Sequence, residues 1–194
     1  MRKIKFTFLT TFGLLSAFSC FSQEYNWGVG LRVGDPMGIT VKKYLTDNRA
    51  LELNVGRAFY WWGHESRFKV CDDPTFADCK FWGYPRSSFA LGVQGHYLFQ
   101  KDIVELKGLQ WYYGFGGQLR FNRYEYQYKL EGNKTWFYAT KPEFDIGGDA
   151  VIGLEYIFPN APIAVFADVN VFVEVFDNLF LFWPQGGFGG RYNF

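Results

Sequence analysis

The sequence predicts an all-β protein, an eight-stranded antiparallel up-and-down transmembrane β-barrel, and three observations support this prediction. Apolar and polar residues alternate in eight separate runs of the 194-residue chain, and a period of two is typical of strands with one apolar face. Beyond residue 22, no stretch reaches the ~18 consecutive apolar residues of a membrane helix. Aromatic residues make up 22% of the chain and methionine occurs only twice, which disfavours a disordered chain and a helix bundle.

Residues 1–22 are expected to form a secretory signal peptide, followed by one barrel domain over residues 23–194. The first five residues include three basic ones, Phe6–Phe18 is apolar, and Cys20 and Ser22 place small residues at the −3 and −1 positions of a cleavage site. The alternative is lipidation of Cys20. The preceding Ala-Phe-Ser makes a poor lipobox, so cleavage after Ser22 is favoured.

Each strand is predicted from its own alternation. In chain order the runs are Tyr25–Gly34, Gly38–Leu45, Leu51–Trp61, Ser88–Phe99, Leu109–Tyr128, Phe144–Tyr156, Ile163–Val175 and Gly187–Phe194. The clearest is Ile163–Val175, where every odd position is apolar while Asp168, Asn170 and Glu174 occupy even ones. Arg57 falls on the apolar face of its run, which indicates a bulge or a position at the rim.

The polar face of these runs is predicted to point inward. It carries glycines and charges of both signs with few lysines, which suits a narrow lumen where acids and bases pair better than it suits a solvated surface. The apolar face would then contact lipid. The alternative is a soluble barrel or sandwich with the apolar face inside. The predicted polar network of the lumen comprises Arg32, Lys42, Glu52, Gln94, His96, Arg120, Asp145, Asp149, Glu155, Asp168, Glu174 and Arg191.

Aromatic residues gather at the strand ends in two groups, as expected for girdles at the two membrane interfaces. One group is Tyr44, Tyr97, Phe99, Trp111, Tyr156, Phe158, Tyr192 and Phe194, and the other is Phe59, Tyr60, Trp61, Trp62, Phe81, Trp82, Phe180, Phe182 and Trp183. Short turns are expected at 46–50, 100–108 and 159–162, on the periplasmic side. Outward loops are expected at 35–37, 63–86, 129–141 and 178–185, and all but the first are longer than most of the turns.

Two outward segments are candidates for external contacts. The run Leu109–Tyr128 is far longer than the ~10 residues that cross a membrane. Its end is therefore predicted to project outward and to pair with the segment before Phe144. The side chains expected to be presented there are Tyr124, Tyr126, Tyr128, Trp136 and Tyr138. In the loop 63–86, Cys71 and Cys79 are predicted to form a disulfide in an oxidising compartment, because a metal-thiolate site would need two further ligands and only His64 is near.

These features together resemble the small eight-stranded outer-membrane β-barrel family of Gram-negative bacteria. The resemblance is carried by the signal peptide, the opening Trp27-Gly28-Val29-Gly30-Leu31-Arg32 and the terminal Gly189-Gly190-Arg191-Tyr192-Asn193-Phe194. It implies an outer-membrane location, contact with membrane lipid and lipopolysaccharide, and recognition of the last strand by the barrel-assembly machinery. Phe188, Tyr192 and Phe194 correspond to that assembly signal, although Gly190 interrupts its alternation.

One loop motif is a candidate for catalysis. Some barrels of this kind act on lipid A, and His64-Glu65-Ser66 with Asp72 resembles a catalytic His-x-Ser with an acidic partner, but in the deacylases this motif belongs much later in the chain. A solvated polar loop is the simpler interpretation. No metal or cofactor site is predicted, because the aspartates after Asp72 lack the glycine turn and spacing of a calcium loop. With a net charge of +1, no nucleic-acid partner is expected.

The expected function is therefore a structural or surface-interaction role, with the lumen filled by side chains and the external loops forming the binding surface for an extracellular protein or glycan. A lipid A-modifying enzyme using His64 and Ser66 is one alternative. A narrow pore is another, but eight strands leave an interior just wide enough for side chains.

Overall fold

The computed structural model describes residues 26–59, 79–82, 86–130, 134–175 and 182–194. Residues 1–22, the predicted signal peptide, lie outside these ranges. The strands are β1 (Trp27–Gly34), β2 (Met37–Thr46), β3 (Arg49–Arg57), β4 (Cys79–Trp82), β5 (Arg86–Asp102), β6 (Leu109–Leu130), β7 (Phe137–Ile157), β8 (Ile163–Glu174) and β9 (Phe182–Asn193). No helix in the described part of the chain is long and apolar enough to span a bilayer.

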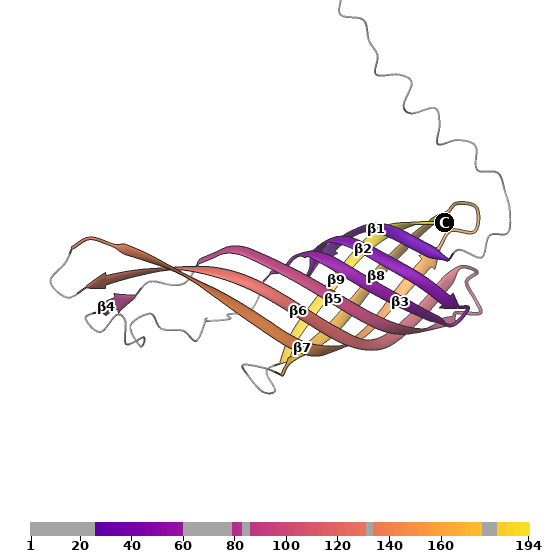
Figure 1. Cartoon of the computed structure of the whole chain (residues 1–194). Coiled ribbons are helices and arrows are strands. Elements are labelled where there is room, and N and C mark those ends of the chain that lie inside the picture. The colour runs from indigo at the N-terminus through magenta and orange to yellow at the C-terminus, as the bar shows by residue number, and fades with distance from the viewer. Residues whose placement is uncertain (1–25, 60–78, 83–85, 131–133, 176–181) are drawn as a thin grey trace, which may run out of the picture.

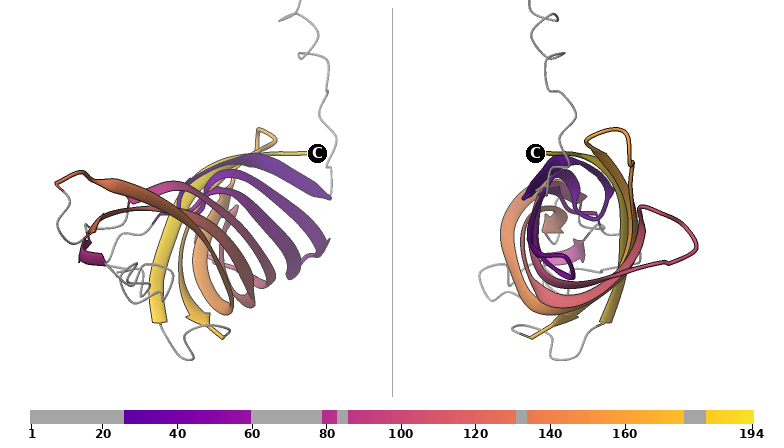
Figure 2. Two further views of the ribbon diagram at one scale, coloured as in Figure 1. Left: turned by 60° about the vertical axis from the view of Figure 1, so that its left-hand side comes forward. Right: turned by 90° about the vertical axis from the view of Figure 1, so that its right-hand side faces the viewer.

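Eight of these strands close into one antiparallel barrel. Their order around the wall is β6-β5-β3-β2-β1-β9-β8-β7, and pairing of β6 with β7 completes the ring. The first and last strands form one of the joints, where the Trp27 and Asn26 amides donate to the Phe194 carbonyl at 3.0 and 3.2 Å. The predicted fold class, an eight-stranded up-and-down barrel, is confirmed (Figures 1 and 2).

The stagger of the strands fixes the width of the barrel. The stagger is found by following cross-strand partners once around the ring, each residue being paired with the one before it. Starting at Trp27, the partners are Lys43, Leu51, Tyr97, Phe115, Ala150, Val171 and Pro184. Because Gly187 pairs with Gly34, Pro184 is level with position 37, which is ten residues beyond position 27. With usual strand spacing and rise, this stagger requires a tilt of about 40° and a radius of about 8 Å. The lumen therefore has room for side chains and little else.

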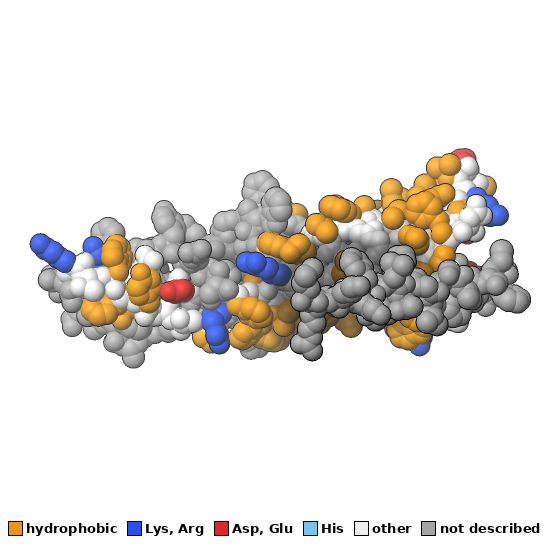
Figure 3. Space-filling view, turned by 90° about the horizontal axis from the view of Figure 1, so that it is seen from above, with side chains coloured by type: hydrophobic (Ala, Val, Ile, Leu, Met, Phe, Trp, Pro, Cys, Tyr) orange, Lys and Arg blue, Asp and Glu red, His pale blue; other side chains and the backbone are white. Residues whose placement is uncertain are grey.

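The wall is apolar outside and polar inside. Along β8, exposed and buried residues alternate almost without exception, with Val169 60% exposed and Asp168 7% exposed. Outward residues of the other strands are also large and apolar, for example Leu31 and Phe115 at 68% and 60% exposure. In the space-filling view, most side chains on the visible barrel wall are hydrophobic (Figure 3). Such a surface is suited to hydrocarbon rather than to water.

The two ends of the barrel differ in what lies beyond the wall. Short turns join β2 to β3, β5 to β6 and β7 to β8 at the end where Asn26 and Phe194 lie, which we call the terminal end. At the opposite end, β6 and β7 continue together beyond the wall (Figure 1). Their pairing runs without a break to Tyr128 opposite Phe137, which confirms that the end of the long run pairs with the segment before Phe144. We call the segments 124–130 and 134–143 the outer hairpin.

Several boundaries differ from the predicted ones. β9 begins at Phe182 rather than Gly187, because Trp183 and Gln185 continue the inward positions despite Pro184 between them. β3 ends at Arg57, so that this residue lies at the rim and needs no bulge. β4 is an additional strand inside the predicted loop 63–86. It pairs with the end of β6, from Cys79 opposite Leu130 to Trp82 opposite Tyr128, and so adds a third strand to the outer hairpin.

Two aromatic residues assigned to the girdles by the sequence point into the barrel instead. Tyr44 packs against an interior apolar cluster of Ala50, Leu98, Tyr112 and Val151. Trp183 pairs across strands with the buried Phe172 and lies 5.7 Å from the Arg120 guanidinium. The residues two positions along the same strand, Lys42 for Tyr44 and Gln185 for Trp183, are polar and point inward. The two-residue period therefore decides the direction of both rings, against the tendency of aromatic residues to lie at membrane interfaces.

Candidate functional site

The half of the lumen nearer the chain termini holds a buried ion-pair network. The Arg191 guanidinium on β9 donates from Nη1 to Glu155 Oε1 at 2.7 Å and from Nη2 to Glu52 Oε2. On the other side of Glu155, Lys42 Nζ donates to Oε2 at 2.6 Å. The four side chains are at most 1% exposed. Charges taken this far out of water are tolerated only when paired, and here β2, β3, β7 and β9 each supply one.

His96 extends this network towards the middle of the barrel. Its Nε2 lies 2.9 Å from Asp149 Oδ1 and its Nδ1 lies 3.8 Å from Glu52 Oε1. Gln94 Nε2 donates to the other Asp149 oxygen at 3.0 Å, and Asn54 Nδ2 donates to Glu52 at 2.9 Å. Each imidazole nitrogen thus faces a carboxylate from a different strand, and the ring acts as a bridge between them rather than as a base aimed at open space.

A second buried pair lies beside the first. Arg32 on β1 forms a two-pronged bond with Asp168 on β8, at 2.6 and 2.7 Å, and the Tyr112 hydroxyl donates to the same carboxylate at 3.2 Å. The Phe166 ring lies against both buried arginines, 5.9 Å from the Arg32 guanidinium carbon and 3.7 Å from that of Arg191. An aromatic ring in this position holds two like charges apart and offers each a favourable cation–π contact.

At the end of the barrel nearer the outer hairpin, Asp35 of the β1–β2 turn reaches across the lumen to Arg120 on β6. Asp35, between β1 and β2, accepts from Arg120 Nη2 at 3.2 Å and from the Phe59 amide at 3.2 Å. Arg120 also donates to the Phe59 carbonyl at 2.9 Å. Burial raises the pKa of Asp35, and its contacts with Arg120 and the Phe59 amide act against this rise. Two residues further outward on β6, Asn122 Nδ2 donates to Asp145 at 3.0 Å.

Large inward side chains lie over glycines of the neighbouring strand. The pairs are Arg32 over Gly187, Phe166 over Gly189, Leu98 over Gly114, His96 over Gly116, Tyr112 over Gly153 and Phe172 over Gly147. A Cβ atom added at any of these glycines would stand between 2.5 and 2.9 Å from the covering side chain, which is closer than a packed interior allows. Because these glycines have no side chain, they leave the room that the polar network and its aromatic neighbours occupy.

All twelve residues of the predicted polar network lie inside the barrel, and none is more than 7% exposed. Several further interior residues belong to this network and were not predicted. Asp35, Thr40, Gln100, Tyr112 and Asn122 are buried and bonded to its members. Tyr112 shares the even positions of its strand with Gln110 and Gln118, so strict use of the period would have placed it inside.

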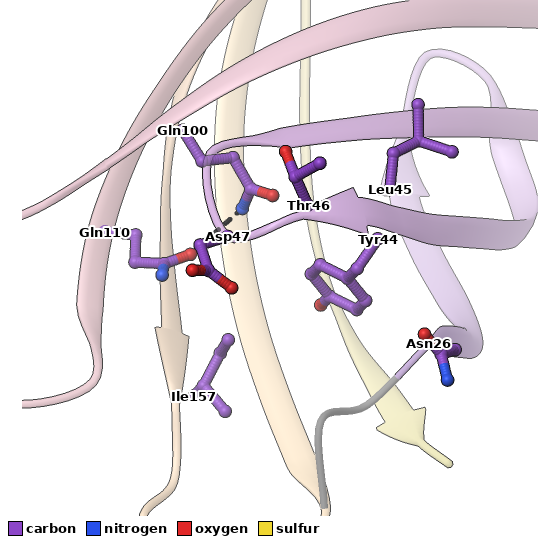
Figure 4. Close-up of a pocket in the computed structure, with 8 residues that line it drawn as sticks. All are labelled: Asn26, Tyr44, Leu45, Thr46, Asp47, Gln100, Gln110 and Ile157. Carbon is purple, nitrogen blue, oxygen red and sulfur yellow. Dashed lines mark hydrogen bonds between the residues drawn. The ribbon is translucent and has the colours of Figure 1, made fainter.

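The end of the barrel that carries the chain termini opens into a cavity of about 440 Å³. It is lined by Asn26, Tyr44, Leu45, Thr46, Asp47, Gln100, Gln110 and Ile157 (Figure 4). Its inner limit is set by Tyr44 and Gln100, whose hydroxyl and amide contact Glu155 at 3.4 and 3.2 Å. Glu155 itself is fully buried, so the cavity ends where the ion-pair network begins.

The candidate contact residues lie on the outer hairpin. Trp136 and Tyr138 are 40% and 61% exposed. The Lys129 ammonium lies 4.3 Å from the Trp136 ring, and Tyr128 stacks on Phe137 at 5.7 Å. The backbones of Tyr124 and Tyr126 pair with Lys141 and Ala139. The hairpin therefore presents aromatic surface beyond the barrel.

Most of the residues predicted for catalysis and for the disulfide lie outside the described ranges. His64, Ser66, Asp72 and Cys71 all do, so the proposed catalytic set and the Cys71–Cys79 disulfide stay predictions; Cys79 begins β4. Among the described residues, no cluster of His, Cys, Asp or Glu has the arrangement of a metal site. On the final strand, the residues of the predicted assembly signal point outward, with Phe188, Tyr192 and Phe194 at 61%, 49% and 58% exposure.

A closed eight-stranded wall with an apolar exterior and an ionic interior defines a class of fold, that of small membrane β-barrels. No protein-family model and no curated protein sequence matches the chain. Among solved structures, it is similar to the N-terminal β-barrel domain of Pseudomonas aeruginosa OprF, with a TM-score of 0.56 at 13% identity over 89% of this chain and 100% of that one. Ail, the attachment invasion locus protein of Yersinia pestis, matches with a TM-score of 0.42 at 10% identity over 87% and 93% of the two chains. The chain thus has the fold of the small eight-stranded outer-membrane barrels of Gram-negative bacteria, as the sequence predicted.

Proposed function

We propose that the protein is an integral outer-membrane barrel with a surface-interaction role, and that the outer hairpin is its binding surface. The observation that carries this proposal is the continuous β6–β7 pairing beyond the wall, to Tyr128 opposite Phe137. A barrel that only had to seal itself in a membrane would not need this extension, because ~10 residues suffice to cross. Exposed aromatic side chains on such an extension are suited to an extracellular protein or glycan.

The orientation follows from the two ends of the barrel. Short turns and the termini would face the periplasm, and the outer hairpin would face the exterior, as in other barrels of this fold. The apolar wall supports a membrane location, since residues such as Leu31 and Val169 are more than half exposed. Cell fractionation with surface labelling of the hairpin tests this location.

We also propose that the lumen does not conduct. Arg191, Glu52, Glu155 and Lys42 cross it from four strands, and Tyr44 and Gln100 close the cavity at the terminal end. Planar-bilayer recordings of the purified protein should therefore show a flat baseline. Stable openings would support the pore alternative instead.

The binding role is tested with a double variant. Replacing Trp136 and Tyr138 with Ser removes exposed aromatic surface while the barrel wall stays unchanged. The matched control is Phe158→Ser, which removes a side chain of similar exposure, 41%, at the opposite end. Wild-type and control proteins in lipid nanodiscs should give the same binding pattern on an array of immobilised glycans and extracellular proteins, and the double variant should lose it.

If the double variant and the wild type gave equal signals, the hairpin would not be the binding surface. The enzyme alternative makes a separate prediction. In that case the lipid A acylation profile of cells producing the wild-type protein would differ from that of cells producing His64→Ala or Ser66→Ala. An unchanged profile supports a binding role over catalysis.

A further inference from the structure

The lipid-facing wall carries a notch at one side of the barrel. It is lined by Trp111, Ile152, Gly153, Leu154, Ala167, Asp168 and Val169, and its volume is about 350 Å³. The notch exists because Ala167 occupies an outward position between Val165 and Val169, where a larger side chain would continue the wall. Asp168 contributes backbone, since its carboxylate is held inside by Arg32. The side chains that surround the gap are apolar.

One edge of the notch lies next to a cation. Lys101 and Trp111 are directly opposite on β5 and β6, and the Lys101 ammonium lies 5.6 Å from the centre of the Trp111 ring. The following residue, Asp102, is the last of β5, so Lys101 stands at the rim that carries the short turns. Trp111 is opposite Leu154 on β7, and Leu154 is opposite Ala167 on β8, so a row of paired residues leads from Lys101 into the notch.

We infer that this notch, together with Lys101, binds one glycerophospholipid of the periplasmic leaflet. Its acyl chain would lie in the gap over Ala167, and its phosphate would pair with Lys101. The inference rests on the proposed outer-membrane location, because the terminal end then meets the leaflet made of phospholipid rather than of lipopolysaccharide. Charge complementarity selects the occupant, since a cation at the interface and an apolar gap beside it match the two parts of such a lipid.

A second lysine–tryptophan pair at the same end provides an internal comparison. The Lys43 ammonium lies 5.1 Å from the Trp27 ring, and on its other side Lys43 pairs with Leu51, a full-sized outward side chain. This pair offers the same interfacial chemistry without the alanine gap. A lipid that recognised only cation and aromatic ring would bind equally at both places, whereas a lipid that needs the notch would bind at Lys101 alone.

The experiment is native mass spectrometry of the protein released from phosphatidylglycerol vesicles into mild detergent. The wild type should retain one phosphatidylglycerol molecule. Lys101→Gln should lower the retained fraction about fivefold, the loss of one lysine–phosphate attraction, and Ala167→Leu should lower it at least about threefold by filling the gap. Lys43→Gln is the matched control and should retain lipid as the wild type does.

Two results would overturn the inference: a wild-type protein that retains no lipid, or an Ala167→Leu variant that retains as much as the wild type. Ala167→Leu adds an apolar side chain on a lipid-facing wall and is not expected to disturb folding, which heat-modifiable migration on gels verifies for each variant. Flotation with the vesicles distinguishes a failure of the proposed membrane location from a failure of the proposed lipid site. A protein that does not float contradicts the membrane location, and one that floats without retaining lipid contradicts only the notch.

Discussion

The barrel body and the outer hairpin are parts of one continuous sheet, yet they are stabilised in different ways. In the body, every strand has two partners, and buried ion pairs join strands on opposite sides, as Arg191 joins β3 and β7. In the hairpin, β6 and β7 pair with each other and β4 covers part of the β6 edge. The body resists change because many contacts fix each residue, while the hairpin depends on its ladder and a few aromatic contacts. An interaction surface gains from this difference, since its residues can change without loss of the scaffold.

The largest effect is expected where the body is most connected. Arg191→Met removes the shared partner of Glu52 and Glu155 and leaves buried negative charge uncompensated, which should lower the free energy of unfolding by about 3–5 kcal/mol. Urea unfolding in lipid vesicles measures it. Arg57→Met is the control, because Arg57 is exposed at the rim beside Phe59 and should change stability by less than about 1 kcal/mol. Equal losses in the two variants would mean that the ion pairs do not stabilise the body.

A somewhat smaller effect is expected from the inner wall itself. A Cβ atom at Gly30 would stand 1.9 Å from the Gly190 carbonyl oxygen, whereas one at the outward Gly95 would have nothing within 4 Å. Gly30→Ala should therefore cost about 2–3 kcal/mol, or prevent closure of the ring, while Gly95→Ala stays close to the wild type. Heat-modifiable gel migration and urea unfolding report both properties. If both variants behaved alike, close strand approach would not be what requires glycine inside.

In the hairpin, the same kind of change should remain local. Tyr128→Ala removes the ring that stacks on Phe137 and should loosen the hairpin by about 1 kcal/mol without affecting the body. Hydrogen exchange of the amides of 124–130 in nanodiscs should accelerate, with unchanged protection in β1, β2 and β9. Tyr138→Ala is the control, since this side chain is 61% exposed. Faster exchange throughout the barrel would show that the two regions are not independent.

The smallest effect is expected at a buried amide that takes no part in the network. Gln118 is 1% exposed, and neither of its amide atoms has a hydrogen-bond partner among the described residues. Replacing it with Leu removes an unsatisfied polar group, so the free energy of unfolding should change by less than about 1 kcal/mol or rise slightly. A loss comparable to that of Arg191→Met, measured in the same urea series, would show that Gln118 has partners inside the lumen.

Much of this architecture is predictable from the sequence because its main signal is local. Alternation alone placed Asp168 and Glu155 inside and Val169 outside, since a side chain two residues away along a strand must share its face. The same rule extends to Tyr44 and Trp183, but there the preference of aromatic residues for membrane interfaces was given more weight and the prediction was wrong. The start of β9 was missed because Pro184 and Gly186 interrupt the pattern that defines a strand.

The partners inside the lumen could not be predicted in this way. Arg191 meets Glu52, which is 139 residues away in the chain, because the stagger of ten residues brings these positions to the same level. Stagger is a property of the closed ring, and no local run of residues encodes it. Composition could show that acids and bases share the interior, but it could not assign Lys42 to Glu155 or Arg32 to Asp168. The outer hairpin was predictable in part. The length of its strands follows from the sequence pattern, whereas the pairing of β4 with β6 does not.

The joint between β1 and β9 has a consequence for biogenesis. β1, which is synthesised before the other strands of the ring, gains its second partner only when β9 has been made, through pairing that includes the bonds between Trp27 and Phe194. Any product cut short before β9 retains two unpaired edges, on β1 and β8, and each is a template for adding strands of another chain. Closure of the ring therefore waits until β9 is made, and until then both edges must be kept from pairing with other chains.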